Sequence, residues 1–177
     1  MNPLFRPARL PDDAALLLDL NTEYLQSVFD GVAAVYPFTL ADVFPGGNIR
    51  AYLAGALDKV VSGAPGSAFY IVEVDGQVAG MGGLRAVRPG IAEMKRVYVR
   101  PAFRGARLGL AIVDRLMADA RGFGYTQMFL DTAPTLTTAI ALYQRLGFAD
   151  IPPYPEVEVS PLLHPIWVFM GRSLQAG

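Results

Sequence analysis

Hydrophobic and polar residues alternate along this chain with two different periods, and the change of period marks out the expected elements. Residues 11–29 (PDDAALLLDLNTEYLQSVF) repeat apolar side chains at helical spacing behind Asp12 or Asp13, either of which suits an N-cap. Residues 47–63 (GNIRAYLAGALDKVVSG) repeat this pattern behind Asn48. The sequence therefore predicts two helices before the first long strands.

The middle of the chain has the pattern of paired strands. Residues 68–74 (AFYIVEV) and 77–87 (QVAGMGGLRAV) are apolar runs joined by Asp75-Gly76, a dipeptide typical of a tight hairpin turn. Residues 92–99 (AEMKRVYV) predict a third strand. The hairpin and this strand should lie side by side in one sheet.

Helical and extended patterns then alternate to the end of the chain. Residues 107–121 predict a helix whose apolar side chains lie on one face, and residues 125–131 predict a strand. Residues 134–148 predict a further helix, which begins at Pro134 or its neighbours and ends at Gly147 and Phe148 in the manner of a Schellman cap. A loop and a last strand at residues 164–170 follow. With a first strand around RPARL, this order predicts an α/β protein, with helices and strands interleaved on one mixed sheet.

Composition narrows the possible classes of protein. The 177 residues suit a single domain over 1–177, and 53% hydrophobic against 18% charged residues exclude a disordered chain. The apolar excess favours either an oligomer contact, with a homodimer as the expected state, or an apolar ligand channel. A net charge of -1 gives no general attraction for nucleic acid or an anionic membrane. No apolar segment approaches about 20 residues, so we expect a soluble, cytoplasmic protein.

Two scarce residue types exclude further chemistry. The chain has no cysteine, which removes disulfides, thiolate nucleophiles and zinc-thiolate sites. His164 is the single histidine, so a multi-histidine metal site is impossible and no metal is expected. We expect His164 to be a surface or packing residue.

One stretch departs from the neutral total. Between Met94 and Arg121 there are seven basic residues against two acidic ones, gathered around RPAFRGARLG immediately before the helix at residue 107. A helix N-terminus with glycine and arginine suits a phosphate, because its first amides have no partner within the helix. A solvated basic face with a glycine turn explains the pattern equally well.

The two common nucleotide motifs are missing. There is no G-x-x-x-x-G-K-[ST] sequence, and GMGGLR at residues 80–85 lies within a hairpin instead of a strand-to-helix turn. We interpret GMGG as a strand of small residues that another backbone or a ligand approaches closely.

Four segments together resemble the GNAT superfamily of acetyl-CoA-dependent N-acyltransferases: MKRVYVRPAFRGARLG, FLDT, AIALYQRLGF and IPPY, within residues 68–154. The resemblance implies a mostly antiparallel mixed sheet flanked by helices, with a splayed strand pair that holds acetyl-CoA as co-substrate. It also implies transfer of the acetyl group to a primary amine of a small molecule or peptide, by direct attack in a ternary complex. A catalytically silent acyl-CoA-binding or protein-interaction module with this fold is the alternative.

The resemblance also implies which residues contact coenzyme A. Backbone amides of the loop hold the pyrophosphate, and the main chain of the preceding strand pairs with the pantetheine arm. The loop residues are Arg104, Gly105, Ala106, Arg107, Leu108, Gly109 and Leu110, and the strand residues are Val97, Tyr98 and Val99.

The sequence departs from the family pattern at two positions. Arg107 occupies a position that is usually glycine; in a helical conformation its side chain could point outward toward the 3′-phosphate, or its bulk could narrow the phosphate path. Leu136 replaces a frequent asparagine and removes one hydrogen bond, a loss of about 1 kcal/mol.

Candidate reactive residues follow from the same resemblance. Tyr143 corresponds to the tyrosine that protonates the leaving thiolate, and Glu93 corresponds to an acidic residue that acts as base through water in some relatives. The alternative for Tyr143 is core packing, and for Glu93 a plain surface glutamate. For acceptor binding we predict an entrance that attracts a cation, although solvated loop acids would give the same sequence. Its residues are Glu23, Tyr24, Asp131, Glu156 and Glu158.

Overall fold

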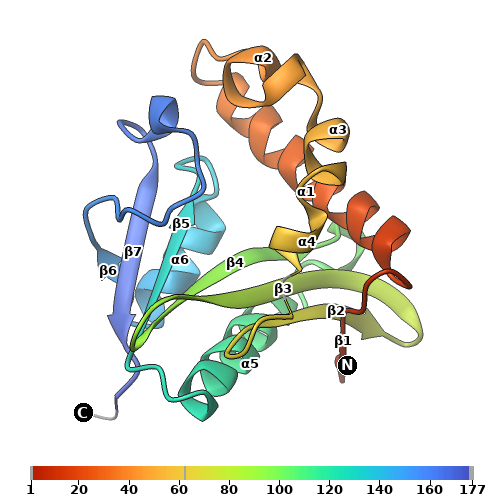
Figure 1. Cartoon of the computed structure of the whole chain (residues 1–177), viewed down its shortest axis with the longest axis vertical. Helices are drawn as coiled ribbons and strands as arrows, with labels where there is room; N and C mark the ends of the chain where they lie inside the picture. The colour runs from red at the N-terminus through yellow and green to blue at the C-terminus, as the bar shows by residue number, and fades with distance from the viewer. Residues whose placement is uncertain (1, 62, 176–177) are drawn as a thin grey trace.

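The computed structural model describes residues 2–61 and 63–175 and contains one seven-stranded sheet in the order β1-β2-β3-β4-β5-β7-β6. All neighbouring strands are antiparallel except β4 and β5, which are parallel. The predicted mixed, mostly antiparallel sheet is therefore confirmed (Figure 1). The strands are β1 (Leu4–Pro7), β2 (Ala68–Val74), β3 (Gln77–Arg88), β4 (Ile91–Val99), β5 (Gln127–Thr132), β6 (Ala149–Asp150) and β7 (Val168–Ser173).

Helices cover both faces of this sheet. The long helix α1, with α3 and α4, lies on one face, and α5 lies on the opposite face (Figure 1). The helices are α1 (Ala14–Ala33), α2 (Leu40–Val43), α3 (Ile49–Ala54), α4 (Leu57–Val60), α5 (Leu108–Gly122) and α6 (Thr137–Arg145). Short 3-10 turns are η1 (Pro45–Gly47), η2 (Pro101–Phe103) and η3 (Pro161–Leu163). No helix in the described part of the chain is long and apolar enough to cross a membrane.

Two apolar cores result from this layering. On the α5 face the apolar stripe of α5, including Ile112 and Leu116, packs with Tyr143 of α6 and with alternate residues of the central strands. On the other face Leu17 and Leu20 of α1 pack on Ile71, among other strand residues. Strand β2 over most of its length, and β3 over its middle, are buried on both sides because each face carries its own helices, whereas β6 at the edge of the sheet is exposed.

The small residues of β3 permit close packing, as the GMGG pattern predicted. A Cβ on Gly82 would lie 2.5 Å from a methyl of Ile112, and a Cβ on Gly80 would collide with the carbonyl oxygen of Tyr98. Glycine at these positions therefore lets α5 and the backbone of β4 approach the strand.

Several predicted boundaries are confirmed. Asp75 and Gly76 have φ of 51° and 75° in the hairpin turn, and the side chain of Asn48 accepts a hydrogen bond from the amide of Ala51. At the end of α6, the amide of Phe148 bonds to the carbonyl of Tyr143 and that of Gly147 to Gln144, which is the expected Schellman pattern.

Other boundaries differ from the prediction. The second expected helix divides into α3 and α4 at Gly55 and Ala56, where glycine has a low helix propensity. The last helix begins at Thr137 with Leu136 as N-cap, so Pro134 does not open it. Asp13 precedes α1, but its carboxylate binds Arg6 and the amide of Arg9 instead of capping the helix. His164 packs its ring against Phe169, with centroids 5.4 Å apart, in keeping with a packing role.

Candidate active site

The centre of the sheet opens between β4 and β5. Only three residue pairs join these strands, the last of them Glu93 with Phe129. Beyond that pair β5 continues alongside β7 as far as Thr132, whereas β4 keeps β3 as its sheet neighbour. The diverging strands leave one backbone edge of β4 without a strand partner, and this is the predicted splay.

A bulge lies on the open part of β4. Lys95 is opposite Gly83 and Tyr98 is opposite Met81, so Arg96 and Val97 together face the single residue Gly82. Arg96 has φ of 58°, a left-handed conformation that is uncommon outside glycine. Ahead of the bulge Met94 faces the α5 core and Lys95 the opposite side; after it Val97 and Val99 face α5 and Tyr98 faces α1.

The bulge also fixes which backbone groups point into the gap. The carbonyl of Tyr98 points to Gly80 and the amide of Arg100 bonds to Ala79, so both residues use their backbone toward β3. Because successive residues of a strand point their polar groups to opposite edges, those of Val97 and Val99 face the gap. The Val99 carbonyl accepts a hydrogen bond of 3.2 Å from Nε of Arg104, which anchors the following loop to the strand.

The loop before α5 exposes a row of amides. Residues 105–110 donate no amide hydrogen bond to any described part of the chain, and the first amide of this turn to find a backbone partner is that of Ala111, which bonds to Arg107. A cavity of about 260 Å³ lies against Arg107, Leu108, Leu110 and Ala111, and its lining also includes Pro3, Ala106 and the acidic Asp114. Unpaired amides at a helix start, next to a cavity and basic side chains, fit a pyrophosphate.

Arg107 adopts a conformation that explains why relatives favour glycine there. Its φ and ψ are 58° and 18°, so it is left-handed, and the helical conformation considered from the sequence is wrong. The side chain is exposed, pointing away from the buried helix face that begins with Leu108. The other departure, Leu136, packs against an apolar cluster of Val28, Val32 and Ala133.

On the other side of the gap lies a second cavity, of about 300 Å³, enclosed by α1, α3, β4, β5 and the segment before β7. Part of its wall is apolar and comes from the N-terminal helices. The charged side chains come from β4, β5 and the segment between β6 and β7, and that segment also contributes Val159, Ser160, Leu163 and Trp167. The charged lining residues are Glu93, Lys95, Arg96, Asp131 and Glu158. We call this cavity the acceptor pocket.

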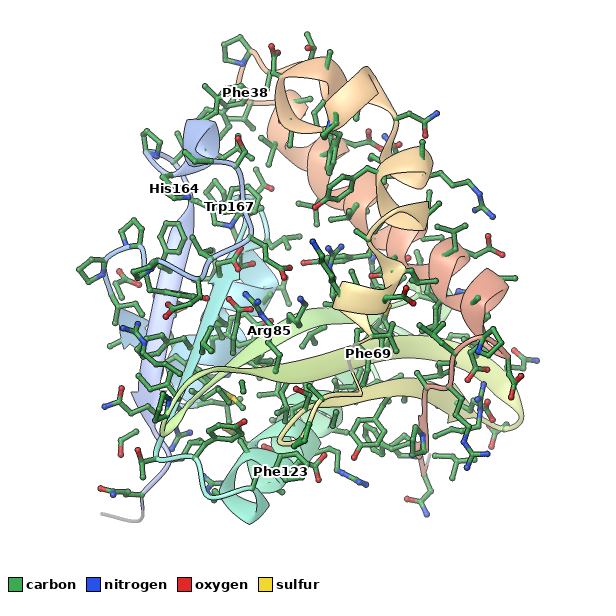
Figure 2. The ribbon with its side chains drawn as sticks, viewed as in Figure 1. Phe38, Phe69, Arg85, Phe123, His164 and Trp167 are labelled. Atoms are coloured by element: carbon green, nitrogen blue, oxygen red, sulfur yellow. The ribbon has the colours of Figure 1, made fainter. Side chains whose placement is uncertain are left out.

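Asp131 and Tyr24 both line this pocket. Nε1 of Trp167 donates a hydrogen bond of 2.6 Å to Oδ2 of Asp131, and Trp167 is labelled in Figure 2 between the C-terminal strands and α1. Burial is the main cause that raises the pKa of Asp131 to about 6, with the charge of Glu93 adding to it. Burial likewise raises the pKa of Tyr24 to about 12. Asp131 therefore titrates in a range where it can exchange protons.

Comparison with known proteins decides the family. The model of the acetyltransferase (GNAT) family matches residues 36–148. The uncharacterized N-acetyltransferase YjgM of Escherichia coli (strain K12) is 32% identical over 158 residues, 85% of this chain and 84% of that protein. The chain belongs to the GNAT family of acetyltransferases. Its class as an acyl-CoA-dependent N-acyltransferase is thereby confirmed.

Two further relatives show how the likeness is distributed. An uncharacterized N-acetyltransferase of Dictyostelium discoideum is 48% identical over 64 residues, only 36% of this chain and 30% of that protein. YncA of Salmonella typhimurium, solved with its cofactor acetyl-CoA, has a TM-score of 0.60 at 20% identity, over 100% of this chain and 96% of that one. The fold of this GNAT chain is thus shared over its whole length.

Glu93 is buried in this GNAT chain and is no surface glutamate. It is 2% exposed, its Oε2 accepts a hydrogen bond of 2.5 Å from Nε of Arg85, and its Oε1 accepts one of 2.6 Å from the hydroxyl of Tyr154. Both carboxylate oxygens are therefore occupied, although the side chain lines the acceptor pocket.

Tyr143 extends from α6 and lines neither cavity, although it lies close enough to Tyr24 and Asp131 for their charges to act on it. Its ring is 7% exposed and packs edge-on against Phe148 with centroids 5.9 Å apart, so the packing role is real. Its hydroxyl makes no hydrogen bond with the described residues. Burial raises the pKa of Tyr143 above its usual value, and the charges of Tyr24 and Asp131 add to the rise. Tyr143 is therefore a protonated, unengaged hydroxyl near the acceptor pocket.

The remaining predicted acceptor residues occupy different places. Glu158 lines the pocket, whereas Glu23 forms an ion pair of 2.7 Å with Arg100 and Glu156 one of 3.5 Å with Arg88, and neither belongs to the pocket lining. The side chain of Tyr98 packs on Tyr24 at 5.8 Å, on the α1 side of the sheet. The main-chain carbonyl of Tyr98 points to Gly80 of β3, so the predicted contact of Tyr98 with the cofactor is wrong: neither its side chain nor its carbonyl faces the gap.

Two residues that line the pocket, Arg96 and Trp167, and one that bonds to a lining residue, Tyr154, escaped the sequence reasoning. Arg96 was counted only as one of several basic residues, and Trp167 and Tyr154 were read as parts of loop and strand patterns. A signal existed for Trp167, since it is the single tryptophan of the chain. Nothing in the sequence pairs it with Asp131 or Tyr154 with Glu93, because those contacts span 36 and 61 residues.

Proposed function

We propose that this protein transfers an acetyl group from acetyl-CoA to a primary amine of a small molecule or peptide, by direct attack in a ternary complex. The observation that carries the proposal is the position of the free amides at residues 105–110, beside a strand gap that has the acceptor pocket on its other side. YjgM, named an N-acetyltransferase, and YncA, solved with acetyl-CoA, support the same activity.

The cofactor half of the site would use backbone groups. Acetyl-CoA supplies an acetyl group activated as a thioester. The amides from Gly105 to Leu110 would hold its pyrophosphate, and the edge of β4 at Val97 and Val99 would pair with the pantetheine arm as an added strand does. Arg104 and Arg107 place positive charge next to the phosphates.

The acceptor half must remove a proton from the amine. An alkyl ammonium ion has a pKa near 10, so presenting the free amine at pH 7 costs about 4 kcal/mol. Asp131 has one carboxylate oxygen without a hydrogen-bond partner among the described residues and a pKa of about 6, so we assign it to hold the ammonium group and receive its proton. Glu93, with both oxygens bonded, would keep Arg85 and Tyr154 in place or act through water.

Tyr143 would serve the leaving group. Its hydroxyl is protonated and makes no hydrogen bond with the described residues, so it can donate to the sulfur as negative charge develops there. The raised pKa makes Tyr143 a weak acid in the free protein. The developing thiolate, with a pKa near 8.5, would be stabilised first by the hydrogen bond.

Four expectations from the sequence belong to the same proposal. The chain would act as one domain and as a homodimer in the cytoplasm, without a nucleic acid or membrane partner. A net charge of -1 supports the last point, since no overall field draws the protein to polyanions.

Calorimetric titration with acetyl-CoA, and with dephospho-CoA for comparison, tests the proposal first. Micromolar binding that weakens without the 3′-phosphate is the expected result, because cationic side chains flank the phosphate loop. A protein that binds neither compound would not be an acyl-CoA-dependent enzyme, and the amides at residues 105–110 would then need another explanation.

A further inference from the structure

The charges that line the acceptor pocket fall into two groups. Glu93 and Glu158 are neutralised within the protein: Arg85 contacts both, at 2.5 Å and 3.3 Å, and Lys95 lies 2.9 Å from Glu158. In the described part of the chain, Arg96 and Asp131 have no such ion pair, either with each other or with another residue. One cation and one anion therefore remain for a ligand.

The side chain of Arg96 destabilises the protein when no ligand is bound. Its Nη1 is fully buried and has no hydrogen-bond partner among the described residues. The guanidinium contacts the ring of Tyr24, whose centroid lies 5.9 Å from the guanidinium carbon, and its charge also acts on Asp131, whose pKa it lowers. A buried donor on a charged group is destabilising when it is unpaired. A guanidinium held in this way is suited to a planar anion such as a carboxylate, which it can bind through two parallel hydrogen bonds.

The bulge of β4 is what brings Arg96 to the pocket. Lys95 already faces this side, so in a regular strand the next side chain would face α5. The extra residue, in its left-handed conformation, turns Arg96 to the same side as Lys95. Backbone strain of about 1–2 kcal/mol is thus maintained at the position that directs an unpaired cation into the pocket.

The opposite charge and an apolar wall complete the arrangement. Asp131 accepts one hydrogen bond, from Trp167 to Oδ2, which leaves Oδ1 for a cation. The N-terminal helices supply apolar side chains to the same pocket, namely Val28, Phe29, Val32, Val43, Phe44 and Tyr52. The rings of Phe29, Phe44 and Tyr52 pack on one another, with centroids 6.4 Å and 5.5 Å apart, and form a continuous surface.

We propose that the acceptor is a free amino acid with an apolar side chain. Its carboxylate binds Arg96, its ammonium group binds Asp131, and its side chain packs on the wall formed by Phe29, Phe44 and Tyr52. This inference rests on the proposed acetyltransferase function and narrows its acceptor. A simple amine would leave Arg96 unpaired, and an internal peptide amine would bring no carboxylate next to the reacting nitrogen.

The test compares three acceptors that share one side chain but carry a carboxylate, a carboxamide or neither: L-phenylalanine, L-phenylalaninamide and 2-phenylethylamine. L-leucine and L-methionine are compared with their amides in the same way. Release of the coenzyme A thiol is followed at pH 7.5 in the native protein and in Arg96→Gln. We expect kcat/KM to be about 10- to 100-fold higher for the amino acids than for their amides, and Arg96→Gln to remove that preference. Arg88→Gln, which loses a surface arginine paired with Glu156, is the control and should keep it.

A binding measurement removes the dependence on turnover. Trp167 is the single tryptophan and lines the pocket, so its fluorescence reports occupation by phenylalanine or phenylalaninamide in the presence of coenzyme A (Figure 2). We expect tighter binding of the amino acid, and loss of the difference in Arg96→Gln while the thermal midpoint shows that this variant is folded. Arg96→Lys should restore part of the difference, since it keeps the charge but not the paired donors.

The outcomes separate the two proposals. If amines or amides are acetylated as well as the amino acids and Arg96→Gln changes nothing, the acetyltransferase function stands and the amino acid acceptor is wrong. If acetyl-CoA binds but no amino acid alters the fluorescence of Trp167, the amino acid acceptor is also wrong. If acetyl-CoA itself fails to bind, the underlying function falls.

Discussion

The start of α5 and the acceptor pocket lie on two sides of one gap in the sheet, yet the first presents main-chain groups and the second presents side chains. At the start of α5 the unpaired groups are backbone amides, and the residues that carry them, apart from Leu108, are exposed or partly exposed. In the acceptor pocket the groups that lack an ion pair among the described residues are side chains: Arg96, whose Nη1 has no hydrogen-bond partner, and Asp131, which accepts one hydrogen bond from Trp167.

This difference indicates which side of the gap tolerates amino-acid substitutions. A site made of amides depends on backbone conformation, so we expect it to accept many side chains, including Arg107 in its left-handed conformation. A site made of side chains depends on each residue type. Substitutions on the two sides should therefore separate binding of acetyl-CoA from use of the acceptor.

The largest effect should come from Asp131→Asn. Loss of the proton acceptor should lower kcat/KM for the amine about 100-fold, with the Kd of acetyl-CoA within twofold of the native value. In the native protein kcat/KM should fall as the pH drops below about 6, where Asp131 becomes protonated. A pH–rate profile with no acidic limb near 6 would contradict this role.

The same substitution should stabilise the fold at neutral pH. Asp131 has a pKa raised from 3.8 to about 6, so its contribution to stability is present below pH 3.8 and is lost as the pH rises through 6. The loss amounts to at most about 3 kcal/mol. Thermal unfolding should show Asp131→Asn gaining on the native protein between pH 5 and pH 7, since asparagine can still accept the Trp167 hydrogen bond.

Tyr143→Phe should have the next largest effect. Turnover should fall at least tenfold while the affinity for acetyl-CoA and the packing on Phe148 stay similar, because only the hydroxyl is removed. Steady-state kinetics with calorimetry of acetyl-CoA binding measure both quantities. Unchanged turnover would leave Tyr143 as a core residue only.

Gly105→Ala should affect the opposite side of the comparison. Gly105 has φ of 84° with open space around it, so an added Cβ meets no atom but strains the backbone by about 1 kcal/mol. We expect acetyl-CoA to bind about fivefold more weakly, with no change in preference among acceptors. Arg107→Gly is the matched variant, since it relieves a left-handed residue in the same loop and should keep the amides in place.

The smallest effect is expected for Glu156→Gln. Glu156 pairs with Arg88 and lies outside the pocket lining, so the acceptor KM should not change. Glu158→Gln is the informative partner, because it also removes the charge that faces Lys95. A changed KM for Glu156→Gln would mean that the acceptor extends beyond the pocket.

The features that could be predicted from sequence are those with a local cause. The strand pattern, the Asp75-Gly76 turn and the Asn48 cap each depend on neighbouring residues, and each was found. The glycine-rich loop before α5 also has a local cause; its unpaired amides were found, and its binding of phosphate stays a prediction. Tyr143 was assigned through a resemblance whose motif is also local. The order of elements followed from these parts.

The features that were missed depend on distant contacts or on one extra residue. The order of polar and apolar residues in AEMKRVYV does not reveal the bulge. The extra residue becomes visible only when the pairing with β3 is known, which places Arg96 and Val97 opposite the single residue Gly82. The bonds from Tyr154 to Glu93 and from Trp167 to Asp131 join segments far apart in the chain. Arg107 was expected to be helical because its left-handed conformation is disfavoured for every residue but glycine.

The three residue pairs between β4 and β5 have a mechanical consequence. In the described part of the chain they are the ladder that joins β1 to β4 with β5, β7 and β6, and of the six ladders only the terminal β6–β7 ladder, with two pairs, is shorter. An acyl carrier that pairs with β4 in the gap would supply backbone hydrogen bonds that the sheet lacks there. The bound ligand would then bridge the two parts of the sheet, and its release would leave them joined within the sheet by the three pairs between β4 and β5.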